Sequence, residues 1–318
     1  MGFSYEVKEE ISRLKLSSRI EALIELTALA GLNANLAVSQ EGARLRFISE
    51  NLAVIQRVCL LIRYLYQEEM EIFSEQNDRL QQEPIYTTSL PQPYLDQFLE
   101  ASGFNLFGQV TENPERILAR LSNEKNARAY LRGAFLASGS IVDPEKSYHV
   151  EVLVNSAKEI PALLRVADVL ALSFKRTERK DTKIFYLKDS ETISDFLIDI
   201  GASQAMLKLE NTKAKKDLHN DINRQANAQI ANYDRQVKTA SAQLQAIDQI
   251  EKKMGLDRLS PGLREMARVR RENQTANLRE LGEAMHPRLS KSGVRHRLEK
   301  LCQIARDLEN GGGSGDER

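Results

Sequence analysis

Residues 127–139 of this 318-residue chain read ARAYLRGAFLASG, and their pattern predicts a helix that recurs earlier in the sequence. Small and apolar side chains recur there at helical spacing, and Gly139 stands where such a helix would end. Residues 21–32, EALIELTALAGL, have the same character about 105 positions earlier. Each stretch is followed by a strand hairpin, an apolar helix, a second hairpin and a helix that Gly103 or Gly201 stops. The recurrence predicts two copies of one α+β unit.

The strand signals end after the second copy. Residues 212–254 are polar and helix-forming, with sparse apolar anchors, and they predict a long helix that packs against one neighbour or joins two domains. Residues 258–308 then predict three short helices. The second of these begins with a capping-box pattern, Asn277 followed by Glu280, and the third begins at Ser290 or Ser292.

The charge of the chain is unevenly distributed, although 45 Lys and Arg balance 45 Asp and Glu. Residues 1–202 carry 23 basic and 29 acidic side chains, whereas residues 203–318 carry 22 basic and 16 acidic ones. Within residues 258–306, 12 Lys and Arg face only 5 Glu. This asymmetry predicts that the C-terminal part binds a polyanion.

Several classes of protein lack their signals in this sequence. Cys59 and Cys302 lie far apart in apolar helical patterns, which predicts buried thiols in a reducing compartment and neither a disulfide nor a zinc site. The first eleven residues have no apolar run typical of a signal peptide, and no 18-residue apolar window predicts a membrane span. The phosphate-binding and hydrolase motifs are absent as well, so we expect no cofactor.

The third C-terminal helix carries the candidate DNA-reading side chains. Val294, Leu298 and Leu301 predict its buried stripe, which leaves long donors free around its basic first turns. Arg and Lys donate to guanine edges in the major groove, while Ser, His and backbone N–H groups can hold phosphates. The predicted DNA-binding residues are Arg279, Arg288, Lys291, Ser292, Arg295, His296 and Arg297. Further phosphate contacts are expected from Arg268, Arg270 and Arg271, although helical spacing leaves open whether Val269 or Arg270 lies on the inner side. The alternative is an ordinary three-helix bundle with a solvated basic face.

Three stretches resemble the WhiA family. Residues 277–298, from NLRELG to KSGVRHRL, are similar to its helix-turn-helix, and residues 220–227, NDINRQAN, to the helix before it. Residues 130–151, from YLRGAFLASGS to YHVE, resemble its degenerate homing-endonuclease repeat. The resemblance covers the whole chain except the Gly-rich tail. Arg295 departs from the family pattern, which has Asn there.

The resemblance implies an α+β fold with a two-repeat LAGLIDADG homing-endonuclease-like body, a long linker helix and an all-α helix-turn-helix domain. The predicted limits are 1–105 and 106–202 for the repeats, 203–256 for the helical linker, 257–310 for the helix-turn-helix domain and 311–318 for a flexible tail. It also implies sequence-specific binding of double-stranded DNA in cell division and chromosome segregation or in transcription regulation. A cytoplasmic, nucleoid-associated protein with other transcription or division proteins as partners is implied too. A two-repeat body is its own pseudo-dimer, which is compatible with a monomer.

Nuclease activity can be tested on the residues themselves. Homing endonucleases of this fold hold divalent metals with one acidic residue near the end of each central helix. The corresponding positions here are Asn33 and Ser138, and the nearest acid in the first copy, Glu25, lies two turns upstream. The sequence therefore predicts no catalytic residue and no metal, and an active endonuclease is the rival hypothesis. The small residues Ala28 and Gly133 instead predict close packing of the two helices.

Basic side chains on the predicted strands leave a second DNA surface open. The candidates are Arg44, Arg46, Lys175, Arg176 and Lys183. They are expected either to preserve a DNA-facing sheet or to form a solvated face. If DNA contact is secondary, the alternative function is a protein-interaction scaffold. A small-molecule sensor in the region between the repeats lacks a convergent set of polar residues.

Overall fold

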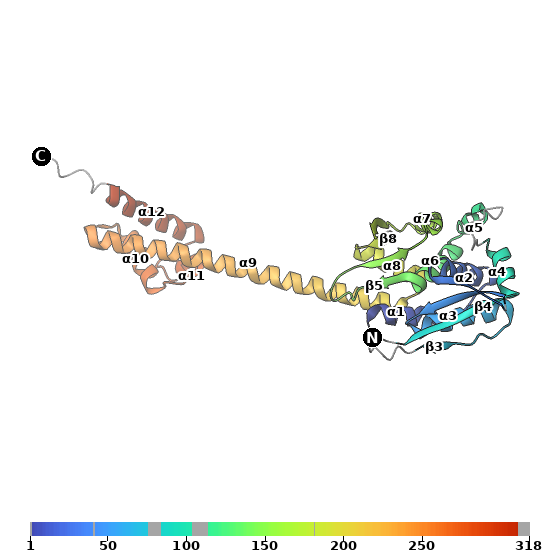
Figure 1. Cartoon of the computed structure of the whole chain (residues 1–318). Coiled ribbons are helices and arrows are strands. Elements are labelled where there is room, and N and C mark those ends of the chain that lie inside the picture. Colours follow the sequence, from blue (N-terminus) through green and yellow to red (C-terminus); the bar gives the residue numbers. More distant parts are fainter. Residues whose placement is uncertain (1, 41, 76–83, 104–113, 181, 311–318) are drawn as a thin grey trace. The chain divides into compact units, whose positions relative to one another are not determined.

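The computed structural model describes residues 2–40, 42–75, 84–103, 114–180 and 182–310 (Figure 1). The chain divides into two compact units, Met1–Lys216 and Asp217–Arg318. One helix, α9 (Ser203–Met254), belongs to both. Its first turns bury Ala205 and Leu209 in the core of the first unit, and its last turns bury Ile247 and Ile250 in the core of the second. The predicted linker helix therefore contributes to both cores.

The first unit contains the predicted repeat twice. The first copy comprises α2 (Arg19–Asn33), β1 (Ala34–Ser39), β2 (Gly42–Ser49), α3 (Leu52–Tyr66), β3 (Phe73–Glu75), β4 (Ile85–Pro91) and α4 (Tyr94–Ser102). The second comprises α6 (Glu124–Ser138), β5 (Gly139–Ile141), β6 (Val150–Val154), the short 3-10 helix η1 (Ala157–Glu159), α7 (Ile160–Val169), β7 (Lys175–Arg179), β8 (Thr182–Leu187) and α8 (Ser190–Ile200). The sheets have matching antiparallel orders, β1-β2-β4-β3 and β5-β6-β8-β7. The two-copy α+β fold is confirmed.

Two helices of the first unit were not predicted, α1 (Phe3–Ser12) and α5 (Pro114–Arg120). Helix α1 buries Phe3, Val7 and Ile11, which are spaced by four residues and so lie on one face. Its other positions are mostly polar or charged. This face joins the core that the two repeats share.

The central helices α2 and α6 lie against each other, and Gly133 permits their close approach. A Cβ atom at Gly133 would lie 2.9 Å from the Cβ of Ala28 and would also overlap the backbone oxygen of Glu25. The predicted close packing at Ala28 and Gly133 is confirmed. Gly31 has a different reason to be small, because a Cβ there would meet the carboxylate of Glu159 at 2.5 Å.

The sheets present one face to the helices. Leu45 and Phe47 of β2 are buried, and so are Val152 of β6 and Phe185 of β8. Side chains alternate between the two faces of a strand, so the positions between these residues point to the opposite, outer face. This alternation fixes which basic side chains of the strands can meet a partner.

The second unit is built from α10 (Pro261–Glu272), α11 (Leu278–Glu283) and α12 (Lys291–Asn310), with the 3-10 helix η2 (Leu256–Arg258) before them. The predicted capping box is formed: the backbone N–H of Asn277 donates to Glu280 Oε2 at 2.7 Å, and Asn277 Oδ1 accepts from the N–H of Glu280 at 3.1 Å. The core includes Met266, Leu281 and Val294, one from each helix. Within the described parts of the chain, no helix combines the length and the apolar character that crossing a membrane requires.

Candidate nucleic-acid interface

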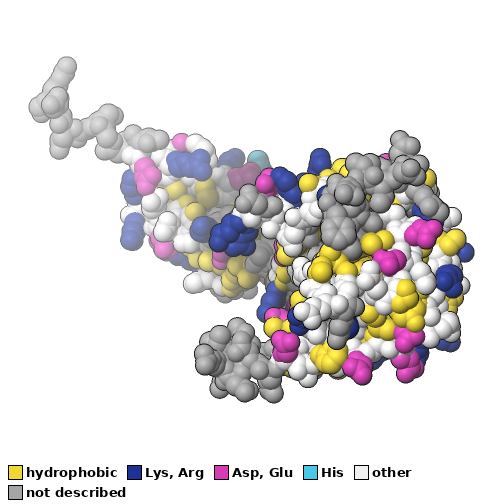
Figure 2. All heavy atoms as spheres, turned by 45° about the vertical axis from the view of Figure 1, so that its right-hand side comes forward, with side chains coloured by type: hydrophobic (Ala, Val, Ile, Leu, Met, Phe, Trp, Pro, Cys, Tyr) yellow, Lys and Arg dark blue, Asp and Glu magenta, His cyan; other side chains and the backbone are white. Residues whose placement is uncertain are grey.

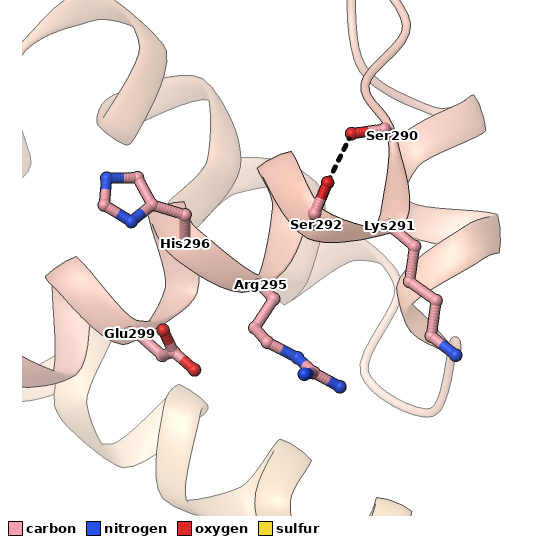
Figure 3. A pocket seen from close by; sticks show the side chains of 6 residues that line it. All are labelled: Ser290, Lys291, Ser292, Arg295, His296 and Glu299. Atoms are coloured by element: carbon pink, nitrogen blue, oxygen red, sulfur yellow. Dashed lines mark hydrogen bonds between the residues drawn. The ribbon is translucent and has the colours of Figure 1, made fainter.

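Helix α12 separates a buried stripe from an exposed polar face. Val294, Leu298 and Leu301 are buried, as predicted. On the other side, Lys291, Ser292, Arg295 and His296 are exposed and line one open pocket together with Ser290 and Glu299 (Figure 3). The long side chains of Lys291 and Arg295 extend to the same side of the helix (Figure 3). The structure thus brings four of the seven predicted residues together.

The start of α12 is a positively polarised end. Ser290 caps it, since Ser290 Oγ accepts from the N–H of Gly293 at 3.2 Å and lies 2.9 Å from Ser292 Oγ (Figure 3). Free N–H groups in the first turn carry partial positive charge that adds to the charge of Lys291. This combination of backbone donors and a cation suits phosphate oxygens.

The other three predicted residues lie elsewhere. Arg279 on α11 is an exposed side chain whose Nε lies 3.2 Å from Glu283 Oε1, and Arg288 is exposed in the connection to α12. Arg297 is half-buried on the side of α12 that faces α10, where it donates to the backbone oxygen of Gly262 at 3.2 Å. Arg297 therefore has a structural contact apart from the exposed group.

The expectation that Arg270 meets phosphate is wrong. Arg270 is 2% exposed and donates to the backbone oxygens of Ala276, at 2.7 Å, and of Gln274, at 3.2 Å. Burial lowers the pKa of its guanidinium. It holds the loop that leads into α11. Arg271 is likewise engaged, with Asp248 of α9 at 2.7 Å and with Glu251.

Helix α9 contributes residues that sequence reasoning missed. A second open pocket, of about 680 Å³, is lined by Lys291 and Arg295 on one side and by Asn232, Arg235 and Gln236 of α9 on the other. The donors at the start of α12 thus continue into a polar groove with a further cation, Arg235. The signal that could have found it is the run of Asn, Arg and Gln between apolar anchors of the long helix.

The basic side chains of the strands do not form one surface. Arg44 and Arg46 flank the buried Leu45, so they point to the outer face of β2, where Arg46 lies 3.2 Å from Glu75. Lys175 is paired with Tyr186, on the outer face of the second sheet. On the face of the first unit turned forward in Figure 2, Lys and Arg are scattered rather than gathered.

Two of the five strand residues lie on the helix-covered side of their sheet and not on the outer face. Arg176 pairs with Phe185, and Lys183 pairs with Val154, both of which are buried partners on the helix-covered side. Cross-strand neighbours point to the same side of a sheet, so Arg176 and Lys183 do not share the face of Lys175. Lys183 instead forms an ion pair with Glu178.

The ends of the two central helices carry neutral donors where a nuclease would hold metals. Asn33 Nδ2 donates to the backbone oxygen of Ile48 at 2.8 Å, and Ser138 Oγ donates to that of Leu153 at 2.7 Å. Each acceptor lies 15 residues after its donor, so the two bonds are equivalent in the two repeats. Among the described residues, no three His, Cys, Asp or Glu side chains gather as a metal would need. These helix ends do not fit a divalent ion.

Glu25, the nearest acid upstream, is occupied within the core. It is 1% exposed and accepts from Arg57 Nε at 2.6 Å, from Arg57 Nη2 at 2.9 Å and from Arg132 Nη1 at 3.1 Å. Arg132 comes from the other repeat and also donates to the backbone oxygen of Ile200 at 2.9 Å. Glu25 therefore ties the repeats together as an ion-pair centre.

Comparisons with known proteins agree along the whole chain. Residues 19–104 match the WhiA N-terminal LAGLIDADG-like domain, residues 127–219 the WhiA LAGLIDADG-like domain and residues 222–305 the WhiA C-terminal HTH domain. The probable cell division protein WhiA of Staphylococcus aureus strains JH9 and COL is 35% identical over 313 residues, 98% of either chain. The crystal structure of full-length DUF199/WhiA from Thermatoga maritima is 25% identical, covers 96% of this chain and 98% of its own, and superposes with a TM-score of 0.60. The chain belongs to the WhiA family.

Proposed function

We propose that this chain binds double-stranded DNA through the first turns of α12 and acts in cell division. The observation that carries the proposal is the exposed group of Lys291, Ser292, Arg295 and His296 opposite a fully buried stripe. The name of the relatives, probable cell division protein, supports the cellular role. Chromosome segregation or transcription regulation, in the cytoplasm and at the nucleoid, would be the setting, with other division or transcription proteins as further partners.

The proposed division of labour follows from the chemistry of each donor. Arg295 can donate two parallel hydrogen bonds to a guanine edge, which is the commonest specific contact of the major groove. Ser292 and the N–H groups of the first turn would fix the helix on phosphate oxygens. Arg279, Arg288 and Arg235 would extend the contact along the backbone. Arg270 and Arg297 are left out, because both already donate to backbone oxygens of the second unit.

For the LAGLIDADG-like unit we infer no nuclease activity. Asn33 and Ser138 offer hydrogen-bond donors where metal-bound cleavage needs carboxylates. The full chain is expected to leave supercoiled plasmid intact in magnesium. Nicking that requires magnesium and disappears on Asn33→Ala would contradict this inference.

DNA binding is tested by fluorescence anisotropy of the full chain on a duplex selected from random sequence with the same protein. Each phosphate contact contributes about −0.9 to the slope of log affinity against log salt. The variant Lys291→Ala/Arg295→Ala should therefore flatten the slope by up to about 1.8 and lose preference for the selected duplex. Arg306→Ala is the matched control, an exposed arginine nearer the other end of the same helix. Equal losses in both variants would contradict the assignment of α12's first turns.

A further inference from the structure

The first unit contains an open pocket that is separate from the helix-turn-helix. The pocket, of about 410 Å³, lies where α2 and α6 end. Helix α1 contributes Ser4, Tyr5 and Lys8 to its wall, α2 contributes Asn33, and the turn before α3 contributes Glu50 and Asn51. The pocket is at the lower end of the size range of small-molecule sites.

Lys8 is a cation without a counter-ion in the described part of the chain. No Asp or Glu oxygen there lies within 4.0 Å of its Nζ, and its recorded contact is with the ring of Phe135, 5.8 Å from the centroid. Burial lowers the pKa of the Lys8 ammonium to about 8. At neutral pH the group is still mostly protonated, so a half-buried charge faces the open pocket without an anionic partner among the described residues.

Asn51 likewise presents a polar group that has no partner, the N–H donor of its side-chain amide. The residue is 7% exposed and caps α3, since its Oδ1 accepts from the N–H of Ala53 at 2.9 Å. That bond fixes which way the amide points. Its Nδ2 is buried and has no hydrogen-bond partner among the described residues. A buried donor left unpaired is destabilising, so an acceptor atom placed there would be stabilising.

The polar groups of this pocket are predominantly donors. Lys8, Asn51, Ser4 and Tyr5 all carry N–H or O–H groups, and the positive end of α3 lies at the same place. Among the described residues of the wall the one carboxylate is that of Glu50, which is exposed and can turn toward solvent. We propose that the pocket binds an oxyanion of the phosphate class, with one oxygen on Lys8 Nζ and another on Asn51 Nδ2. Free phosphate and a nucleic-acid backbone both present this oxyanion, and the experiment separates the two.

The test is calorimetric titration of the full chain with inorganic phosphate at constant ionic strength. Saturable binding is expected, and Lys8→Met should raise Kd about tenfold or more, because a charge-assisted hydrogen bond is lost. Asn51→Ser should also weaken binding, since Ser still caps α3 but has no amide donor. Lys15→Met, at an exposed lysine beyond α1, is the matched control and should leave Kd unchanged.

A second readout follows the pKa of Lys8 in the wild-type protein itself. Reductively ¹³C-dimethylated wild-type protein should show one lysine resonance titrating near pH 8, absent in Lys8→Met, and phosphate should raise that pKa. If phosphate has no effect but a short duplex raises the same pKa, the anion is a backbone phosphate, and this effect should persist in Lys291→Ala/Arg295→Ala. If neither phosphate nor duplex moves the resonance, or if Lys8→Met and Asn51→Ser bind as the wild type does, the proposal is overturned.

Discussion

Replacing Asn33 by Asp restores an acid at the end of the first central helix and changes little else in shape. In the structure, Asn33 Nδ2 donates to the backbone oxygen of Ile48 at 2.8 Å. An ionised carboxylate cannot donate, so Asn33→Asp would set two acceptors against each other. We expect the acid to weaken the fold rather than create a metal site, because no second acid faces it from Ser138.

The size of the effect follows from the rise in the pKa of the new carboxyl group. Losing the hydrogen bond costs about 1 kcal/mol at this half-buried position, and Asn33→Ala measures that part alone. The carboxyl group regains the bond only when protonated, so its pKa should rise in the folded chain. Each unit of rise costs about 1.4 kcal/mol at neutral pH. The rise already contains the lost bond, because the protonated form keeps it, so a rise of about one and a half units predicts roughly 2 kcal/mol for Asn33→Asp at pH 7.

The sign of the pH dependence separates the acid from a simple deletion. A carboxyl whose folded pKa is raised destabilises the fold above that pKa, and the penalty fades as pH falls through it. As pH falls from 7 to about 4, the stability of Asn33→Asp should thus rise toward that of Asn33→Ala and then exceed it. Urea unfolding is followed by near-ultraviolet circular dichroism, because all ten Phe and all but one of nine Tyr precede residue 217.

Lys8 must be controlled for, since it lines the same pocket as Asn33. An ion pair between Lys8 and the new carboxylate would offset the lost bond, so both variants are also made in a Lys8→Met background. In that background, equal stability of Asn33→Asp and Asn33→Ala at pH 7, or a difference that stays constant down to pH 4, would refute the reasoning.

Three further changes test the core of the first unit by the same unfolding measurement. Gly133→Ala should destabilise the fold by about 1–3 kcal/mol, because the added Cβ would overlap the backbone of Glu25. An unchanged urea midpoint would contradict that contact. Glu25→Gln should lower the free energy of unfolding by about 3–5 kcal/mol, because it leaves the buried charge of Arg57 without its partner. An exposed change such as Glu272→Gln should have a far smaller effect. Burial raises the pKa of Glu159, so the wild-type fold loses stability as pH rises above 4.5. The variant Glu159→Gln can still accept from Tyr130 and should become more stable relative to the wild type over that pH range. A stability difference that does not change with pH would argue against this.

The repeat could be predicted because each copy carries the same alternation of strand and helix patterns. Helix α1 could not, since only Phe3, Val7 and Ile11 mark its buried face and polar residues fill the rest. Composition alone also placed the start of α9 too late, at residue 212, whereas the limit implied by the family resemblance is residue 203. The helix begins at Ser203, two residues after the glycine that caps α8, and Ala205 and Leu209 are buried there by the repeats. In both cases the partner surface, rather than local preference, defines the helix.

The candidate interface shows where residue type misleads. The stripe of α12 was predicted by spacing, and the exposed donors opposite it followed from that spacing. Charge alone also selected Arg270, which the structure buries because its guanidinium satisfies two backbone oxygens of a loop. On the strands, the pairing register places Arg176 and Lys183 on the helix side, which their charge does not reveal. Predicting these outcomes requires knowing the partners of a side chain as well as its charge.

The two helix ends show how the central helices are held to their sheets without carboxylates. In each repeat a neutral donor, Asn33 or Ser138, bonds a strand carbonyl 15 residues ahead and so ties the central helix to its sheet. A carboxylate at either position would exchange that bond for a metal ligand, and without a metal it would face the carbonyl as a second acceptor. Lys8 and the free amide of Asn51 beside these ends add further donors. These donors favour an anion over a cation at this place, and the proposed phosphate site rests on them.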